Sequence, residues 1–204
     1  NFLGTPPQSR ADYAFFQHIL KSMDSQTGRC AILFPHGVLF RREEAEMRQK
    51  LVESDLIECV LGLGPNLFYN SPMEACIVIC RSQKAEKRQG KVLFIDAVEE
   101  ISRERSISFL EPEHQKRIAD VYQSFTDETG FGHIATIEEI SDQDYSLSIP
   151  LHVKRNSNGN DISEDARNLR QIWAEWEQNG MLFWQEMEVL GEMLDKIRNS
   201  TSEQ

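Results

Sequence analysis

The chain lacks a long apolar run and a secretion signal. Hydrophobic residues make up 40% of its 204 positions, enough for a core. No stretch approaches the roughly 18–20 apolar residues that a membrane-spanning helix needs. The start, Asn1-Phe2-Leu3-Gly4, has no basic segment, apolar segment or cleavage site. We therefore expect a cytoplasmic protein without a membrane partner, and we interpret the missing initiator methionine as a sign of an excised segment.

Cysteines are few and lack the spacing of a metal site. The four are Cys30, Cys59, Cys76 and Cys80, and each lies inside an apolar run rather than in a turn. Zinc ligands usually come as a pair on a turn with a second pair elsewhere. The 5 histidines are scattered as well. We therefore expect reduced thiols that pack as small hydrophobic side chains, and no metal.

Positive charge is also scarce. The formal net charge is −11, from 22 Lys and Arg against 33 Asp and Glu. Contacts to DNA phosphates need Lys and Arg side chains. The composition thus argues against a chain that grips duplex DNA across a broad surface.

Three apolar runs predict the strands of an α/β fold. They are Arg29–Phe34, Leu56–Leu63 and Glu74–Cys80, and their flanking Gly and Pro residues are typical of strands buried on both faces. The charged, helix-prone segment Arg42–Ser54 favours a right-handed crossover between the first two runs, as parallel strands. The short connection to the third run favours a hairpin. We expect an antiparallel strand beside the parallel ones, at a mixed edge.

The flanking segments add further elements. Ala11–Met23 has the apolar spacing of an amphipathic helix, and Lys91–Ala97 predicts another strand. Pro112 can occupy the first turn of a helix whose buried stripe runs to Phe125. Thr136–Ile140 is interpreted as a short strand followed by turns.

The C-terminal part carries an apolar heptad pattern beyond a polar, Asn/Gly-rich linker. A capping box at Asp161–Glu164 predicts the start of either one continuous helix or a helical hairpin that turns at Asn179-Gly180. Apolar stripes with large aromatics usually mark an interface, although a helix covering its own domain is the alternative. The predicted partner-interface residues are Trp173, Trp176, Phe183, Met187 and Leu190.

Several motifs in a fixed order resemble the modification subunits of type I restriction–modification systems. They are PHGVLFR at Pro35–Arg41, LIECVLGLGPNLFYNSPMEACIVI at Leu56–Ile79 and KVLFIDA at Lys91–Ala97, with fitting segments at Ala11–Met23 and Asp144–Pro150. These subunits are adenine-N6 DNA methyltransferases that use S-adenosylmethionine and have a class I, Rossmann-like fold. The resemblance implies an α/β fold: the C-terminal half of such a sheet with an antiparallel edge hairpin, followed by a C-terminal helical extension.

Two motifs of the resembled family are missing from the chain. One is the Gly-rich cofactor loop, and the other is the Asn/Asp-Pro-Pro-Tyr/Phe tetrapeptide; the chain has a double proline only in Thr5-Pro6-Pro7-Gln8. We therefore expect a C-terminal fragment without catalytic residues that is inactive alone. Its expected parts are the end of the catalytic domain (1–98), an α/β extension (99–153), a linker (154–162) and a partner-binding helical segment (163–204).

The resemblance also assigns a target-base loop. In these methyltransferases an aromatic in the loop before the last hairpin strand holds the extruded adenine. Phe68 matches that position, Tyr69 is its neighbour, and Asn66 shapes the loop or touches the base. The alternative for Phe68 is a turn aromatic that packs onto the sheet edge.

Two further site predictions concern the cofactor and the border of the active site. Phe16 matches a hydrophobic residue that closes over the adenine of S-adenosylmethionine, and Asp12 lies at the mouth of the same region; plain core packing and a helix N-terminal charge are the alternatives. Pro35 and His36 follow a strand at the end where open α/β sheets bind ligands. We expect them to border the active site, with a loop-shaping role for His36.

The expected partners are DNA and the specificity and restriction subunits of the same system. Because a separate specificity subunit reads the DNA sequence, the low positive charge of this chain is tolerable. The alternative function is a non-catalytic protein-interaction module, in which a small α/β domain presents a coiled-coil helix.

Overall fold

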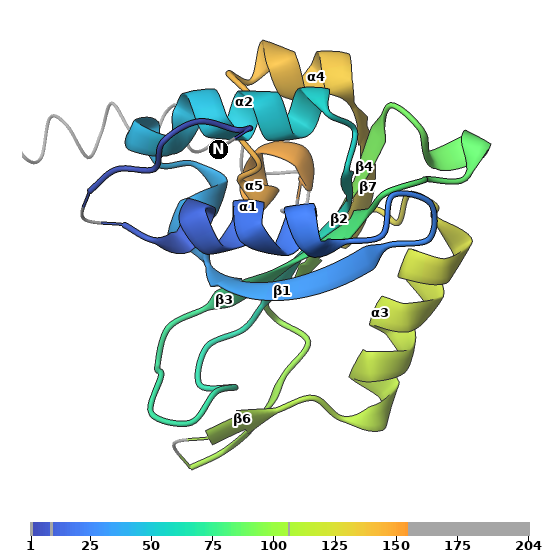
Figure 1. The fold of residues 1–204 in the computed structure, drawn as a ribbon. Helices are drawn as coiled ribbons and strands as arrows, with labels where there is room; N and C mark the ends of the chain where they lie inside the picture. The colour runs from blue at the N-terminus through green and yellow to red at the C-terminus, as the bar shows by residue number, and fades with distance from the viewer. Residues whose placement is uncertain (1, 9, 106, 155–204) are drawn as a thin grey trace, which may run out of the picture. The chain divides into compact units, whose positions relative to one another are not determined.

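The computed structural model describes residues 2–8, 10–105 and 107–154. Contacts divide the chain into Asn1–Arg155 and Asn156–Gln204, and all the described residues belong to the first part. In this part a five-stranded sheet lies between two layers of helices (Figure 1). No helix among the described residues has the length and apolar character needed to cross a membrane.

The sheet is mixed and mostly antiparallel. β3 is antiparallel to β1 and β2, whereas β4 is parallel to β2 and antiparallel to β7. As a result β1, β2 and β4 run in the same direction and end at the same edge of the sheet. The order is β1-β3-β2-β4-β7, with bounds β1 Arg29–Pro35, β2 Ile57–Leu63, β3 Ala75–Arg81, β4 Lys91–Ala97 and β7 Gly132–Thr136.

The position of the hairpin strand differs from the expectation. The predicted antiparallel pair of β2 and β3 is confirmed, but β3 lies between β1 and β2 instead of at the edge. The crossover from β1 to β2 leaves room for one strand, and the hairpin turns back into that gap.

This order also decides which strands are buried. β2, in the middle of the sheet, is buried along its whole length, as predicted. The prediction that the first run is buried on both faces is wrong. β1 is an outer strand of the described sheet, and every second residue on it is exposed, including Leu33 at 47%. The apolar pattern alone does not distinguish a central strand from an outer one.

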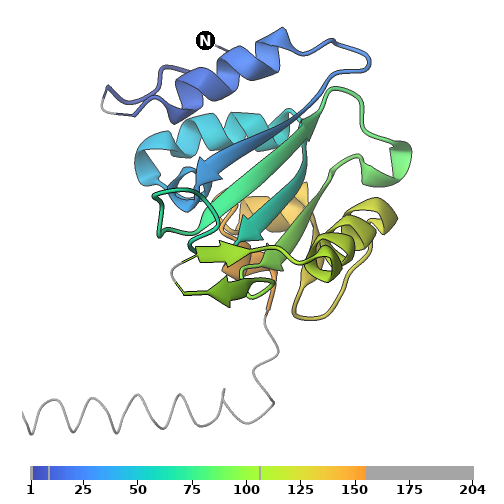
Figure 2. The same cartoon turned by 90° about the horizontal axis from the view of Figure 1, so that it is seen from below.

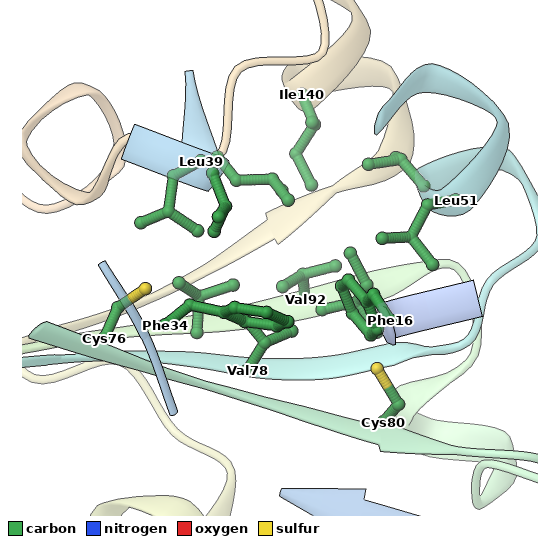
Figure 3. Close-up of a cluster of buried hydrophobic side chains, with 14 of the residues drawn as sticks. Phe16, Phe34, Leu39, Leu51, Cys76, Val78, Cys80, Val92 and Ile140 are labelled. Atoms are coloured by element: carbon green, nitrogen blue, oxygen red, sulfur yellow. The ribbon is translucent and has the colours of Figure 1, made fainter. Parts of the chain in front are cut away.

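One face of the sheet is covered by four helices: α1 (Asp12–Ser22), α2 (Ala45–Glu53), α4 (Ile137–Asp142) and α5 (Ile149–His152). Figure 3 shows the resulting core, in which Phe16, Leu51 and Ile140 meet side chains of the strands. Short 3-10 turns at His36–Leu39 (η1) and Arg42–Glu44 (η2) connect β1 to α2.

The segment after β7 is a helix, so the predicted strand at Thr136–Ile140 is wrong. Thr136 is the N-cap of α4: its hydroxyl accepts a hydrogen bond from the Glu139 backbone, and the Glu139 carboxylate accepts one from the Thr136 backbone. This reciprocal capping box was visible in the sequence as Thr-Ile-Glu-Glu. It satisfies amide groups that an isolated helix start would leave unpaired.

The other face carries α3 (Pro112–Ser124) and a small hairpin of β5 (Ser102–Glu104) and β6 (Ile107–Phe109), seen from below in Figure 2. α3 starts at Pro112 as predicted. It is fixed to the sheet by Tyr122, whose hydroxyl donates to the buried Glu58 carboxylate at 2.5 Å. A third 3-10 turn, η3, occupies Glu86–Arg88 before β4.

Candidate functional site

Three connections meet at the edge where β1, β2 and β4 end (Figure 1). β1 is followed by the Pro35-His36-Gly37 turn, β2 by the loop 64–74, and β4 by the β5–β6 hairpin. The carboxyl ends of parallel strands are where open α/β sheets bind their ligands. The loop 64–74, which holds the residues predicted to contact the target base (the base loop), therefore lies at the same edge of the sheet as the predicted active-site border, Pro35 and His36.

The turn after β1 is tied to the start of β3. His36 Nε2 lies 2.8 Å from the carbonyl oxygen of Ala75, and Pro35 is paired with the same residue in the sheet register. A Cβ atom at Gly37 would lie 2.5 Å from Nε of Arg41, so a larger residue here would have to displace the Arg41 guanidinium. The geometry gives His36 a loop-shaping contact.

Where the base loop leaves the sheet, its backbone packs closely against the segment that follows β4. A Cβ atom at Gly64 would lie 2.5 Å from the carbonyl oxygen of Val98, on the segment that follows β4. Asn66 adopts a left-handed conformation (φ 60°), and its carbonyl accepts a hydrogen bond from the Ser108 backbone at 2.9 Å. These observations give Asn66 a role in shaping the loop.

The two neighbouring aromatics have opposite environments. Phe68 is half-buried and packs against the core cluster on the α3 face, whereas Tyr69 is 97% exposed. They form one tight turn, in which the Ser71 backbone N–H donates to the Phe68 carbonyl at 3.0 Å and Asn70 is left-handed (φ 56°). The turn anchors Phe68 and leaves the ring of Tyr69 free.

The residues predicted to touch the cofactor are engaged within the chain. Phe16 is 2% exposed, and its ring centroid lies 5.1 Å from that of Phe34. Asp12 Oδ2 lies 2.7 Å from Nη1 of Arg41. Phe16 is therefore packed in the core, and Asp12, whose side chain is 32% exposed, is ion-paired, which favours the alternative roles of core packing and ion pairing.

Arg41 lies beside the candidate site, and the sequence motifs alone did not single it out. Its Nη1 bridges Asp12 and Glu44, the latter at 3.4 Å, and the hydrogen bond to Asp12 raises the pKa of the guanidinium. Glu44 is fully buried, and burial raises the pKa of its carboxyl group. One carboxylate oxygen of Glu44, Oε1, has no hydrogen-bond partner within the described part. Arg41 ends the PHGVLFR motif, but only the fold reveals its partners.

Other predictions fall elsewhere. The partner-interface residues Trp173, Trp176, Phe183, Met187 and Leu190 lie outside the described residues.

In the part that the structure describes, no group of three or more His, Cys, Asp or Glu side chains could hold a metal ion. Two cavities of about 540 and 470 Å³ flank β7, and neither is lined by a residue of the base loop or the Pro35-His36-Gly37 turn.

Curated relatives of the chain are methylase subunits of type I restriction enzymes. The MjaVII subunit of Methanocaldococcus jannaschii is 36% identical over 154 residues, which are 74% of this chain and 26% of that protein. The MjaVIII subunit of the same organism is 32% identical, over 95% of this chain and 33% of that protein. The HindI subunit of Haemophilus influenzae is 30% identical, over 84% and 41%. The chain therefore spans about a quarter to two fifths of the length of these relatives.

Solved structures show the same likeness. The methyltransferase subunit of a type I restriction–modification system from Streptococcus thermophilus matches with a TM-score of 0.71 and 34% identity, over 76% of this chain and 32% of that one. The EcoKI M protein matches with a TM-score of 0.57 at 19% identity, over 83% of this chain and 43% of that one, which shows a shared fold.

A family model also matches most of the chain. The model described as N-6 DNA Methylase covers residues 1–161, which include every described element of the sheet. This confirms the family that the sequence motifs predict: the chain belongs to the N-6 DNA methylase family.

Proposed function

We propose that this chain is part of an adenine-N6 DNA methyltransferase of a type I restriction–modification system, which transfers a methyl group from S-adenosylmethionine to an extruded adenine. The family match and the names of the relatives support the reaction class. The observation that carries the proposal is the loop at the carboxyl edge of the sheet, which holds Tyr69 fully exposed on a firmly anchored turn.

The proposed role of this loop is to hold the target base. An enzyme that modifies a base of duplex DNA must extrude it and place it against an aromatic or apolar surface. In this assignment the exposed ring of Tyr69 stacks on the base, and Phe68 anchors the turn through its contacts with the core. Asn66 maintains the loop conformation. Pro35 and His36 border the same edge and hold the start of β3 in place.

The chain by itself offers little for S-adenosylmethionine. Phe16 is inside the core, Asp12 is paired with Arg41, and the sequence has neither a GxGxxG loop nor an Asn/Asp-Pro-Pro-Tyr/Phe tetrapeptide. The residues present therefore do not fit the cofactor. We propose that the cofactor site and the groups that align the adenine amine belong to other residues of a longer protein, and that this chain alone transfers no methyl group.

The test compares the two aromatics in the complete methyltransferase assembly. Stacking of a base on an aromatic ring is worth about 1–3 kcal/mol, so Tyr69→Ala should lower kcat/KM for DNA by about 10- to 100-fold. Tyr69→Phe keeps the ring and should retain activity, and affinity for S-adenosylmethionine should not change in either variant. Wild-type kcat/KM in Tyr69→Ala would contradict the base-holding role.

Phe68→Ala is the companion variant. The structure predicts a loss of loop order with it, because Phe68 is the half-buried anchor of the turn. Its kcat/KM should fall together with a lower melting temperature, whereas Tyr69→Ala should melt like the wild type. A fall in kcat/KM with Phe68→Ala alone, at unchanged melting temperature, would assign the stacking role to Phe68 instead.

The proposed partners of the complete protein are DNA and the specificity and restriction subunits. The partner-binding part is assigned to the heptad segment 163–204 on its sequence pattern. Trp176→Glu with Phe183→Glu would place charges in the apolar seam, and their desolvation should prevent association. Co-purification of the double variant with the specificity subunit, at normal melting temperature, would exclude this interface.

A further inference from the structure

We propose that the β5–β6 hairpin is a second DNA contact beside the base loop, in which Arg103 and Arg105 bind backbone phosphates next to the extruded base. The inference rests on the proposed function, because it takes the substrate to be DNA. It adds an element that none of the sequence motifs identified.

The hairpin and the base loop form one continuous surface. The backbone N–H of Ser108 on β6 donates to the carbonyl of Asn66 at 2.9 Å, so the loop lies against the outer side of the β5–β6 ribbon. Ser108 is 3% exposed, and its hydroxyl has no hydrogen-bond partner among the described residues. Figure 1 shows β6 at the same end of the molecule as the loop that follows β2. A strand of DNA held at the loop therefore passes close to the hairpin.

The arginines of the hairpin differ from the four ion-paired arginines of the described part. Arg41, Arg81, Arg88 and Arg117 each have a carboxylate within 3.4 Å. By contrast, both hairpin arginines are exposed, and neither makes an ion pair or hydrogen bond with another described residue. A guanidinium that is not neutralised locally is free to bind a phosphate bidentately.

The hairpin also contains an acidic residue, and the register separates it from Arg103. Glu104 lies opposite Ile107, whereas Arg103 lies opposite Ser108. Successive residues of a strand point to opposite faces of the ribbon, so the carboxylate and the Arg103 guanidinium leave from different faces. The positive charge of Arg103 is therefore not cancelled by its sequence neighbour.

Exposed apolar side chains accompany these charges. Ile107 is 64% exposed and Phe109 is 38% exposed on the hairpin, and Tyr69 (97%) and Met73 (63%) are exposed on the adjacent loop. By the same register, Ile107 and Phe109 lie on the Glu104 face of the ribbon and not on the Arg103 face. Unpaired cations on an element that also exposes apolar side chains, beside a loop that exposes an aromatic, are typical of surfaces that follow a nucleic-acid strand with unstacked bases. The chemistry fits the DNA strand from which the base is extruded better than an acidic protein surface, because the apolar groups have bases and sugars to contact.

The experiment measures the salt dependence of DNA affinity in the complete methyltransferase assembly. Each phosphate contact contributes about 0.9 to the slope of log K against log salt concentration for duplex DNA. The double variant Arg103→Gln/Arg105→Gln should make this slope shallower by about 2, equally for cognate and non-cognate duplexes. Arg103→Lys/Arg105→Lys retains the charges and should restore most of the slope. Arg29→Gln is the control for the removal of one charge elsewhere, because Arg29 is exposed at the start of β1, at the opposite end of that strand from the turn that borders the base loop.

The outcomes separate the hairpin from the proposed function. An unchanged slope in the glutamine variant, with a loss of kcat/KM in Tyr69→Ala, would overturn the hairpin contact and leave the methyltransferase proposal in place. A change of about half that size in Arg29→Gln, which removes one charge instead of two, would also overturn it, since the effect would then be one of total charge. Loss of the specificity subunit from the glutamine variant would identify a protein interface instead. If the slope is unchanged and Tyr69→Ala also keeps the wild-type kcat/KM, both the hairpin contact and the proposed function are contradicted.

Discussion

Nη1 of Arg41 lies 2.7 Å from Oδ2 of Asp12 and joins the first helix to the turn that follows β1. The same guanidinium reaches the fully buried carboxylate of Glu44 at 3.4 Å. Two segments that border the candidate site are thus held by one cation. The side chain of Arg41 is 16% exposed, so solvent screens this network only partly.

We predict that Arg41→Ala destabilises the chain. It leaves the Glu44 carboxylate buried without its cation, and we expect a loss of about 2–3 kcal/mol, below the 3–5 kcal/mol of a fully buried pair because Arg41 is partly exposed. Urea denaturation measures the change. Adding Glu44→Gln should recover part of the loss, and the exposed neighbour Arg42 supplies the control Arg42→Ala, which should stay within about 0.5 kcal/mol. Equal effects of Arg41→Ala and Arg42→Ala would contradict the network.

Gly64→Ala should destabilise the start of the base loop. Its Cβ would lie 2.5 Å from the Val98 carbonyl oxygen and 2.9 Å from a methyl group of Ile101, and backbone at this point cannot move aside easily. Overpacking of this kind costs about 1–3 kcal/mol, and we expect the upper part of that range. Gly90→Ala is the comparison, because its Cβ meets nothing within 4 Å and only its left-handed backbone (φ 67°) opposes the change. That strain is worth about 1–2 kcal/mol. A smaller loss for Gly64 than for Gly90 in thermal or urea unfolding would refute the close approach.

Cys30 should be the reactive thiol of the chain. It faces Cys80 across β1 and β3, and the hydrogen bond with that residue lowers the pKa of Cys30 to about 7. Burial raises the pKa of Cys76 to about 12, and Cys59 is fully buried with a raised pKa as well. Because the thiolate is the nucleophile, alkylation by iodoacetamide should rise with pH through about 7 and then level off.

Mass spectrometry of the alkylated chain locates the modified residue. Cys30→Ser should abolish the fast phase of alkylation by iodoacetamide. Replacing Cys80 with Ala should shift the midpoint of the Cys30 reaction to higher pH, because the hydrogen bond that favours the thiolate is gone. Fast labelling of Cys59 or Cys76 in the folded chain would show that burial does not protect them.

His152 should make stability fall in mild acid. Burial lowers the pKa of its ring, which is stacked on Phe94 at 4.0 Å between centroids and lies 2.8 Å from the Ser146 carbonyl through Nε2. The folded state therefore resists a proton that the unfolded chain takes up near its ordinary pKa of about 6.5. The contribution to stability is complete above that pH and is lost as the pH falls through the lower, folded-state pKa.

The measurement is the free energy of unfolding between pH 7.5 and 5. The decline caused by one such group is at most about 1.4 kcal/mol per pH unit. His152→Gln should flatten the profile in this window, whereas His18→Gln, at an exposed position of α1, should leave it unchanged. His133 and Glu139 also interact electrostatically with the ring, so both are kept in every variant that is compared. An unaltered profile in His152→Gln would contradict the prediction.

The sequence determined the class of fold and the kinds of elements by local signals. Short apolar runs between Gly and Pro residues specify strands, as for β2, and a proline followed by an amphipathic pattern specifies α3. The hairpin of β2 and β3 was readable from its short connection. Ordered motifs were enough to identify the family. The capping box at Thr136, which starts α4, is a local signal of the same kind.

Only the tertiary structure decided the arrangement of the site. Strand order depends on pairing between distant segments, so nothing in the local pattern of β3 indicated that it inserts between β1 and β2. Phe68 and Tyr69 are adjacent aromatics with the same local signal, and the core beneath the turn buries one and leaves the other exposed. Asn66 meets Ser108 through backbone atoms alone, and a backbone hydrogen bond of that kind leaves no trace in side-chain pattern. The physical reason is common to all three: apolar pattern and turn residues act over a few positions, whereas register and contact between loops follow from how the whole sheet closes its core.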